Sequence, residues 1–191
     1  NDMGDRDVLT EIVRQFNYCK ELLQLEEQSQ LALWNYQLGI QVKSAGLVEQ
    51  ALQFFKASRA LLPMNHWHMM RGESLLIYTY LGECEFLVGE YKDSTQHIQE
   101  ALEHAKTVLE KLMIYKLMSF LYMEEDEEAT TVVESGFLAL ELCNMKISRE
   151  PTKLHVAKEA LLLKWELQNK SDTVLLELPP LTNKEIDVLI Q

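Results

Sequence analysis

Three residues of this sequence have the types and the spacing of a metal site. His97, Glu100 and His104 stand at positions i, i+3 and i+7, so one face of a helix would carry two imidazoles and a carboxylate. Zinc and iron sites usually take a further ligand from another element and an ordered outer shell. Both histidines flank an apolar stripe at its polar edge, so we expect them to be solvated. We therefore predict no metal site.

Other reactive residues lack the partners that catalysis requires. Cys84 has no histidine at helical spacing, and no Ser-His-Asp arrangement stands out. His66 and His68 flank Trp67 where we expect a helix to begin. The acidic run 124–128 lacks the glycine and the alternating ligands of a calcium loop and suits a helix N-terminus. No glycine-rich phosphate loop is present. We expect no catalytic residue, no cofactor and no bound nucleotide.

The composition excludes several classes of partner. Apolar residues make up 47% of the chain and charged residues 25%, as in ordinary folded proteins. The 30 acidic residues outnumber the 18 basic ones, which disfavours binding to nucleic acid or to an anionic membrane. No apolar run reaches the roughly 18 residues of a membrane span. The three distant cysteines fit small buried side chains in a reducing compartment, so we expect a cytoplasmic protein.

An internal repeat organises the helices that carry these residues. Laying residues 32–63 on residues 75–106 pairs small residues with small ones and large apolar residues with large apolar ones. The matched pairs at this shift of 43 residues are Leu38 and Leu81, Gly39 and Gly82, Gly46 and Gly89, Ala51 and Ser94, Phe55 and Ile98, and Ser58 and Ala101. A further shift of 35 residues carries Ser94, Ile98 and Ala101 onto Ala129, Val133 and Gly136. At the same shift, Lys116-Leu117 stands where the repeat would have Leu-Gly.

This pattern predicts pairs of tightly crossed antiparallel helices. Gly39, Ala51 and Ser58 would allow close approach of the two backbones, and Phe55 would fill the next turn. We expect Ala32 to lie outside these close contacts. The order Asn35, Leu38-Gly39, Ala51, Phe55 and Pro63 resembles the tetratricopeptide pattern, whose unit is about 34 residues long. We therefore predict an all-α fold, a right-handed superhelical stack of antiparallel helix hairpins.

The predicted domain covers residues 1–169. Its units lie near 31–63, 67–110 and 111–145, with flanking helices at 7–26 and 151–168, the latter with Pro151 in its first turn. Residues 64–71 should lengthen the first helix of the second unit into one stripe that runs from Trp67 to Val88. Residues 170–191 would be a linker and the start of a further helix. We interpret the chain as a piece of a larger protein.

Four segments carry a more specific likeness. They are residues 11–17 with Leu31-Ala32, Leu38-Gly39 and 51–55, and residues 109–116, 136–143 and 176–183. These segments resemble a helical region of very large bacterial signalling proteins, which join a serine/threonine-kinase-like domain, a predicted P-loop ATPase, this helical region, a GAF domain and often a histidine kinase. The resemblance implies a sensor or linker arm that follows a nucleotide switch.

We expect this chain to act by binding proteins. The first hypothesis is an interaction and signal-relay module of a larger cytoplasmic ATPase or kinase, and its partners would be protein surfaces, peptides or neighbouring domains. The alternatives are a free-standing peptide-binding adaptor and the sensor arm of an ATPase-type transcriptional regulator. The same face could instead pack on a domain outside this chain. The expected groove residues are Leu33, Tyr36, Ile40, Lys43, Thr79, Glu83, Phe86, Leu87, Ile114, Met118, Leu121 and Tyr122.

Overall fold

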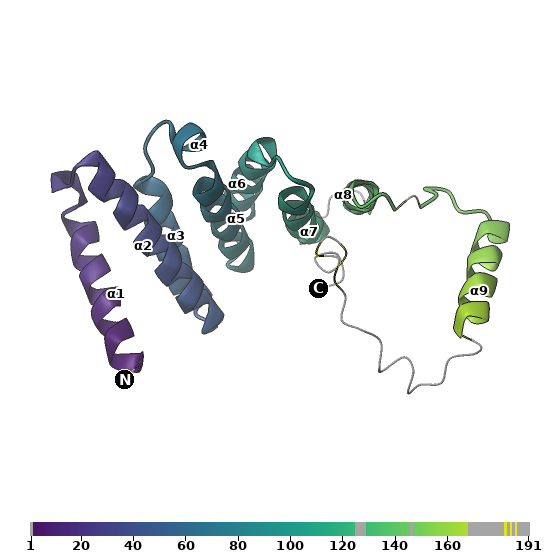
Figure 1. Ribbon diagram of the computed structural model, residues 1–191, viewed down its shortest axis with the longest axis horizontal. Helices are drawn as coiled ribbons and strands as arrows, with labels where there is room; N and C mark the ends of the chain where they lie inside the picture. Colours follow the sequence, from purple (N-terminus) through teal and green to yellow (C-terminus); the bar gives the residue numbers. More distant parts are fainter. Residues whose placement is uncertain are drawn as a thin grey trace.

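The computed structural model describes residues 2–124, 129–145 and 147–167, and the single positions 182, 184 and 186. Within these residues the chain is all-helical (Figure 1), as predicted. The elements are α1 (Asp2–Tyr18), the 3-10 turn η1 (Lys20–Leu22), α2 (Leu25–Ser44), α3 (Val48–Ala60), α4 (His66–Met69), α5 (Arg71–Leu87), α6 (Tyr91–His104), α7 (Val108–Glu124), α8 (Ala129–Leu142) and α9 (Lys153–Leu167). Most of the predicted linker 170–191 and the acidic residues 125–128 lie outside the described residues.

Consecutive helices pack as hairpins. Helix α2 pairs with α3, α5 with α6, and α7 with α8, while α3 packs on α5 and α6 on α7 (Figure 1). The first two hairpins turn at Gly46 and Gly89, whose φ angles are +79° and +85°. Residues with side chains rarely adopt this left-handed region, which explains a glycine at both turns. No helix among the described residues is long and apolar enough to cross a membrane.

The close crossings of the first two hairpins confirm the repeat at 43 residues. A Cβ atom on Gly39 would lie 2.7 Å from the ring of Phe55, and one on Gly82 would lie 2.5 Å from Ile98. Each second helix therefore fits a large side chain against a glycine of the first. The last residues of α2 and α5, Ser44 and Leu87, are also 43 positions apart.

The shift of 35 predicted for the third hairpin is wrong. Helices α5 and α7 begin 37 positions apart, at residues 71 and 108. On a helix, an error of two positions turns a residue by about 200°. In α8, Val133 is 52% exposed and Gly136 has open space where a Cβ would stand, so neither makes the predicted crossing contact. Ser135 and Ala139 are buried instead.

Several helix ends differ from prediction because of capping. Helix α2 begins at Leu25, six residues before the predicted start, since Gln24 and Glu27 form a reciprocal capping box. Accordingly, the flanking helix predicted for 7–26 ends at Tyr18, and η1 follows it. Helix α9 begins at Lys153, two residues after Pro151, where the Thr152 hydroxyl accepts a hydrogen bond from the backbone N–H of His155.

The predicted continuous helix from Trp67 to Val88 is also wrong. Helix α4 is a separate short turn, and Met70 breaks the helical path with φ −134° and ψ 44°. The break lets Trp67 stack on His104 with ring centroids 3.9 Å apart. The indole N–H of Trp67 also donates to Glu100 over 3.0 Å. This packing onto α6 explains why the segment folds back rather than extending α5.

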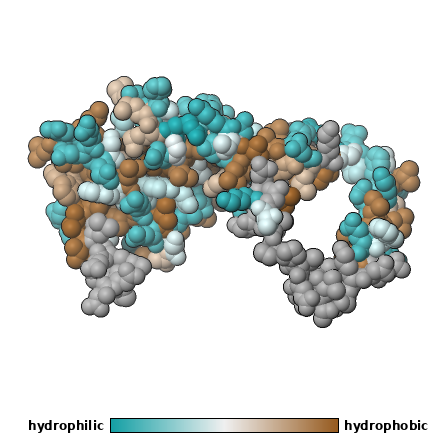
Figure 2. Space-filling view, in the orientation of Figure 1, coloured by the Kyte–Doolittle hydropathy of each residue, from teal (hydrophilic) through white to brown (hydrophobic). Residues whose placement is uncertain are grey.

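The core lies between the helices of the stack from α1 to α8, and α9 lies apart from it. The buried clusters are centred on Leu31 and Phe54, on Phe55 and Leu81, and on Ile98 and Ile114. Every residue of α9 is exposed, and Figure 2 shows apolar residues at the surface of both the stack and α9. Burial of the cysteines is confirmed only for Cys84, because Cys19 and Cys143 are half-buried.

Candidate functional site

The first helices of all three hairpins contribute to one cavity. Its volume is about 420 Å³, and it opens on the side of the stack formed by α2, α5 and α7. Neighbouring first helices are in contact, α2 with α5 and α5 with α7. The lining residues are Lys43 of α2; Thr79, Tyr80 and Glu83 of α5; and Met113, Lys116, Leu117 and Phe120 of α7. We call this the α2-α5-α7 cavity.

One wall of the cavity is polar and internally paired. The ammonium of Lys43 lies 2.7 Å from a carboxylate oxygen of Glu83, which joins α2 to α5. The same ammonium stands 5.2 Å from the centre of the Tyr80 ring, within reach of a cation-π contact. Lys43 is therefore already neutralised, and it offers the cavity no open positive charge.

The opposite wall, formed by α7, is apolar with one cation. Phe120 is 50% exposed, Met113 is also exposed, and Leu117 is a buried lining residue. Lys116 makes no ion pair with a carboxylate among the described residues. An exposed aromatic and methionine beside a lysine can bind a large apolar side chain that has a carboxylate close to it.

Stacked aromatic rings hold the floor of the cavity. Tyr80 stacks on Phe55 with centroids 5.6 Å apart, and Tyr36 and Tyr80 form a T-shaped pair with centroids 5.9 Å apart. Burial, followed by the nearby Tyr80, raises the pKa of Tyr36 to about 12. Tyr36 is thus a neutral packing residue that positions Tyr80, because it does not itself line the cavity.

Three of the predicted groove residues, Lys43, Thr79 and Glu83, do line this cavity. The other predicted residues of α2 and α5 lie elsewhere. Tyr36 and Ile40 pack against the core, as does Phe86, which contacts Tyr91. Leu87 lines a separate hollow beside residues 46–50, and Leu33 is half-buried and lines no cavity described here.

The groove prediction is wrong for Ile114 and Leu121 of α7, because the register predicted for this helix is wrong. Ile114 and Leu121 are buried in the core, Met118 packs against it, and the side chain of Tyr122 lies outside the described ones. A shift of 37 instead carries Thr79, Tyr80 and Glu83 onto Lys116, Leu117 and Phe120, which all line the cavity. Thr107-x-x-Glu110 is a capping-box sequence that marks the start of α7, and it was the signal that could have fixed this register.

The residues His97, Glu100 and His104 do not converge. His97 is buried with its Nδ1 2.7 Å from Glu85, contrary to the solvated position predicted for it. Glu100 accepts the Trp67 hydrogen bond, and the Nδ1–H of His104 donates to the backbone carbonyl of Glu100. No group of three or more His, Cys, Asp or Glu side chains within the described residues is placed to hold a metal ion.

The buried pair of Glu85 and His97 was not predicted. The side chain of Glu85 is 1% exposed, and the rings of Tyr78 and His97 form a T-shaped pair with centroids 5.6 Å apart. A cavity of about 310 Å³ reaches this pair from the side formed by α3 and α6. The pair could move a proton, but the described residues lining that cavity include no serine, threonine or cysteine nucleophile.

Comparison of the chain with known proteins found no matching family model, no similar curated protein and no similar solved structure.

Proposed function

We propose that this chain is a protein-interaction module, and that the α2-α5-α7 cavity binds a segment of a protein partner. The single observation that carries the proposal is the convergence of the first helices of three hairpins on one partly apolar cavity. Stacked helical repeats use extended concave surfaces for binding in this way. The proposal includes a tetratricopeptide-like right-handed superhelix, supported by the hairpin order and by the glycine crossings at Gly39 and Gly82.

The chemistry of the cavity favours one kind of segment. Phe120, Met113 and Leu117 would receive a large apolar side chain, and Lys116 would pair with a carboxylate a residue or two away. The net charge of −12 opposes a strongly acidic partner. The expected ligand therefore carries an apolar anchor and a single acidic group rather than a run of acids.

The wider role that we propose is signal relay within a larger cytoplasmic signalling ATPase or kinase. Its support is the resemblance of the four segments described above. In that setting the ligand would be a segment of a neighbouring domain, and the module would bind without catalysing a reaction.

Selection of random peptides displayed on phage tests the binding proposal. We expect the chain to enrich peptides that combine a large apolar residue with an Asp or Glu, and Lys116→Glu and Phe120→Ser should each abolish their binding. Lys92→Glu is the matched control for the charge reversal, because Lys92 is exposed on α6 and lies outside the cavity. The proposal fails if no peptide is enriched, or if both cavity variants bind the peptides as well as the control does.

A further inference from the structure

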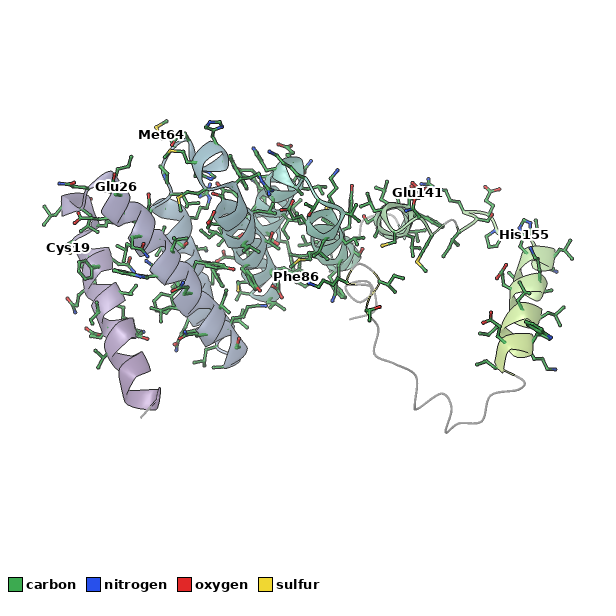
Figure 3. The ribbon with its side chains drawn as sticks, viewed as in Figure 1. Cys19, Glu26, Met64, Phe86, Glu141 and His155 are labelled. Atoms are coloured by element: carbon green, nitrogen blue, oxygen red, sulfur yellow. The ribbon has the colours of Figure 1, made fainter. Side chains whose placement is uncertain are left out.

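The cavity that reaches Glu85 and His97 carries charges of both signs. Helix α5 packs on both α3 and α6, and side chains of the three helices occupy the space between them (Figure 3). The volume of about 310 Å³ is at the lower end of the range for small-molecule sites. The lining residues are Lys56 and Arg59 of α3; Leu81 and Glu85 of α5; and Asp93, Gln96 and His97 of α6. We call this the α3-α5-α6 cavity.

The buried part of this cavity offers two hydrogen-bond acceptors. The hydrogen bond between one carboxylate oxygen of Glu85 and the Nδ1 of His97 is the one that either side chain makes within the described residues. A carboxylate can only accept, so Nδ1 carries the proton, and the Nε2 of a neutral imidazole then accepts. Every buried polar side-chain atom in the described part of the chain has a partner. The second oxygen of Glu85 and the Nε2 of His97 have none there, so they are accessible, and the cavity that both residues line is the way to them.

Two side chains of opposite charge line the same cavity from different helices. Arg59 of α3 stands 5.5 Å from the centre of the Tyr78 ring and makes no ion pair with a carboxylate among the described residues. Asp93, in the first turn of α6, makes no ion pair with any of those residues either. Lys56, by contrast, is paired with Glu90. A cation on α3 and an anion on α6 thus share one cavity without neutralising each other.

We propose that the α3-α5-α6 cavity binds a free α-amino acid. The ammonium group of the ligand has three N–H donors, which match the second oxygen of Glu85, the Nε2 of His97 and the carboxylate of Asp93. The carboxylate of the ligand accepts from Arg59, whose planar guanidinium suits a carboxylate through two parallel hydrogen bonds. One small molecule with a charge at each end therefore satisfies both sides of the cavity.

Small ligands with a charge of one sign match the lining less well. Inorganic phosphate would meet the carboxylates of Glu85 and Asp93 with like charge. A simple amine would leave Arg59 without a carboxylate. The proposed function is separate from peptide binding, because the α3-α5-α6 and α2-α5-α7 cavities share no lining residue.

Thermal unfolding of the full chain with each standard L-amino acid in turn tests the proposal. A ligand that binds the folded chain raises its melting temperature, so we expect at least one amino acid to do so. Calorimetry then compares that amino acid with its deaminated acid and its decarboxylated amine. Each analogue should bind more weakly by about tenfold or more, because each lacks one of the two charged groups. Inorganic phosphate should leave the melting temperature unchanged.

Two variants locate the bound amino acid. Arg59→Gln and Glu85→Gln should each weaken its binding by about tenfold or more, through the loss of a charged partner. Arg59 is exposed, so its replacement should preserve the fold even if that of Glu85 does not. Arg14→Gln is the matched control, because Arg14 is exposed on α1 and lies outside the cavity.

The outcomes separate this site from the peptide site. The Lys116→Glu variant should bind the amino acid as the parent chain does, whatever its effect on peptides. Three results would overturn the site: no amino acid raises the melting temperature, the deaminated acid binds as tightly as the amino acid, or Arg59→Gln binds it as well as Arg14→Gln does.

Discussion

A buried serine links the two helices in each of the first two hairpins. The hydroxyl of Ser58 donates to the Ala32 carbonyl over 2.7 Å, and that of Ser94 donates to the Gly82 carbonyl over 2.6 Å. Both serines are fully buried, so the bonds satisfy hydroxyls that would otherwise cost free energy in the core. The same crossings require small side chains at neighbouring positions.

Enlarging the crossing alanines should destabilise the fold. Ala51 and Ala101 are both completely buried, so Ala51→Leu and Ala101→Leu should each lower the free energy of unfolding by about 1–3 kcal/mol through overpacking. Ala32, expected from the sequence to lie outside these contacts, is itself completely buried and is unsuitable as a control. Ala60 is exposed at the end of α3 and is the control. Ala60→Leu should change the free energy of unfolding by only a few tenths of a kcal/mol. Urea titrations in which all three variants were equally stable would contradict the crossings.

Replacing a glycine by alanine should destabilise the protein in the second hairpin and stabilise it in the third. A Cβ on Gly82 would collide with Ile98 at 2.5 Å and crowd the backbone oxygen of Ser94 at 3.3 Å. Gly82→Ala should therefore destabilise by about 1–3 kcal/mol. Gly136 has no atom within 4 Å of that position, so Gly136→Ala should stabilise by about 0.5–1 kcal/mol through helix propensity. Thermal unfolding measures both, and a stabilised Gly82→Ala variant would refute the close crossing.

At the scale of elements, the start of α7 controls the geometry of the third hairpin. The carboxylate of Glu110 accepts hydrogen bonds from the backbone N–H groups of Lys106 and Thr107, and the Thr107 hydroxyl accepts from the N–H of Glu110. Arg71 at the start of α5 donates both ends of its guanidinium to the same carboxylate. Glu110 thus joins the α6-α7 turn to α5.

This network predicts an acid-sensitive contribution to stability. The Arg71 hydrogen bonds, helped by the backbone N–H groups, lower the pKa of Glu110 to about 2. Because the folded-state pKa is depressed, the stabilisation is complete above the ordinary carboxyl pKa and is lost as pH falls from about 4.5 towards 2. Wild type should lose more stability than Glu110→Gln across that window. Glu103→Gln, at an exposed site on α6, is the control. Parallel melting profiles of wild type and Glu110→Gln would contradict the network.

The sequence predicted the first two hairpins better than the third for a physical reason. Gly39, Gly82 and the two glycine turns leave a local signal, since a side chain would collide at the two crossings and would be strained at the two turns. The third hairpin has no such glycine at its crossing, so its register depended on the capping at Thr107 and Glu110. The shape of the α4 insertion depends on Trp67 stacking against His104, a contact between residues 37 positions apart that periodicity cannot reveal.

The register of each helix also explains why only part of the cavity was predicted. Lys43, Thr79 and Glu83 lie on helices whose register the repeat defines, and they meet as expected. Phe120 and Lys116 were missed because the register of α7 was set two positions away. The burial of Glu85 with His97 could not be read from the sequence, because neither residue is apolar and their pairing depends on how α5 crosses α6.

At the scale of the whole molecule, α9 is separate from the stack. Its apolar residues Leu161 and Trp165 are exposed, and α9 lies apart from the other helices in Figure 1. We therefore predict that replacing both Leu161 and Trp165 by serine leaves the free energy of unfolding unchanged in a denaturant titration. A loss above about 1.5 kcal/mol, which burial of one large apolar side chain contributes, would show that α9 packs on the stack in solution.

Methyl NMR of the methionines tests the central claim most directly, because methionines lie both inside and outside the α2-α5-α7 cavity. Met113 lines the cavity, whereas Met64, Met69 and Met145 are exposed elsewhere. Addition of a peptide selected on the chain should shift the Met113 signal, leave the other three unchanged, and have no effect on the Met113 signal of the Lys116→Glu variant. Shifts of Met64, Met69 or Met145 with an unchanged Met113 would place the binding surface elsewhere and contradict the proposed function.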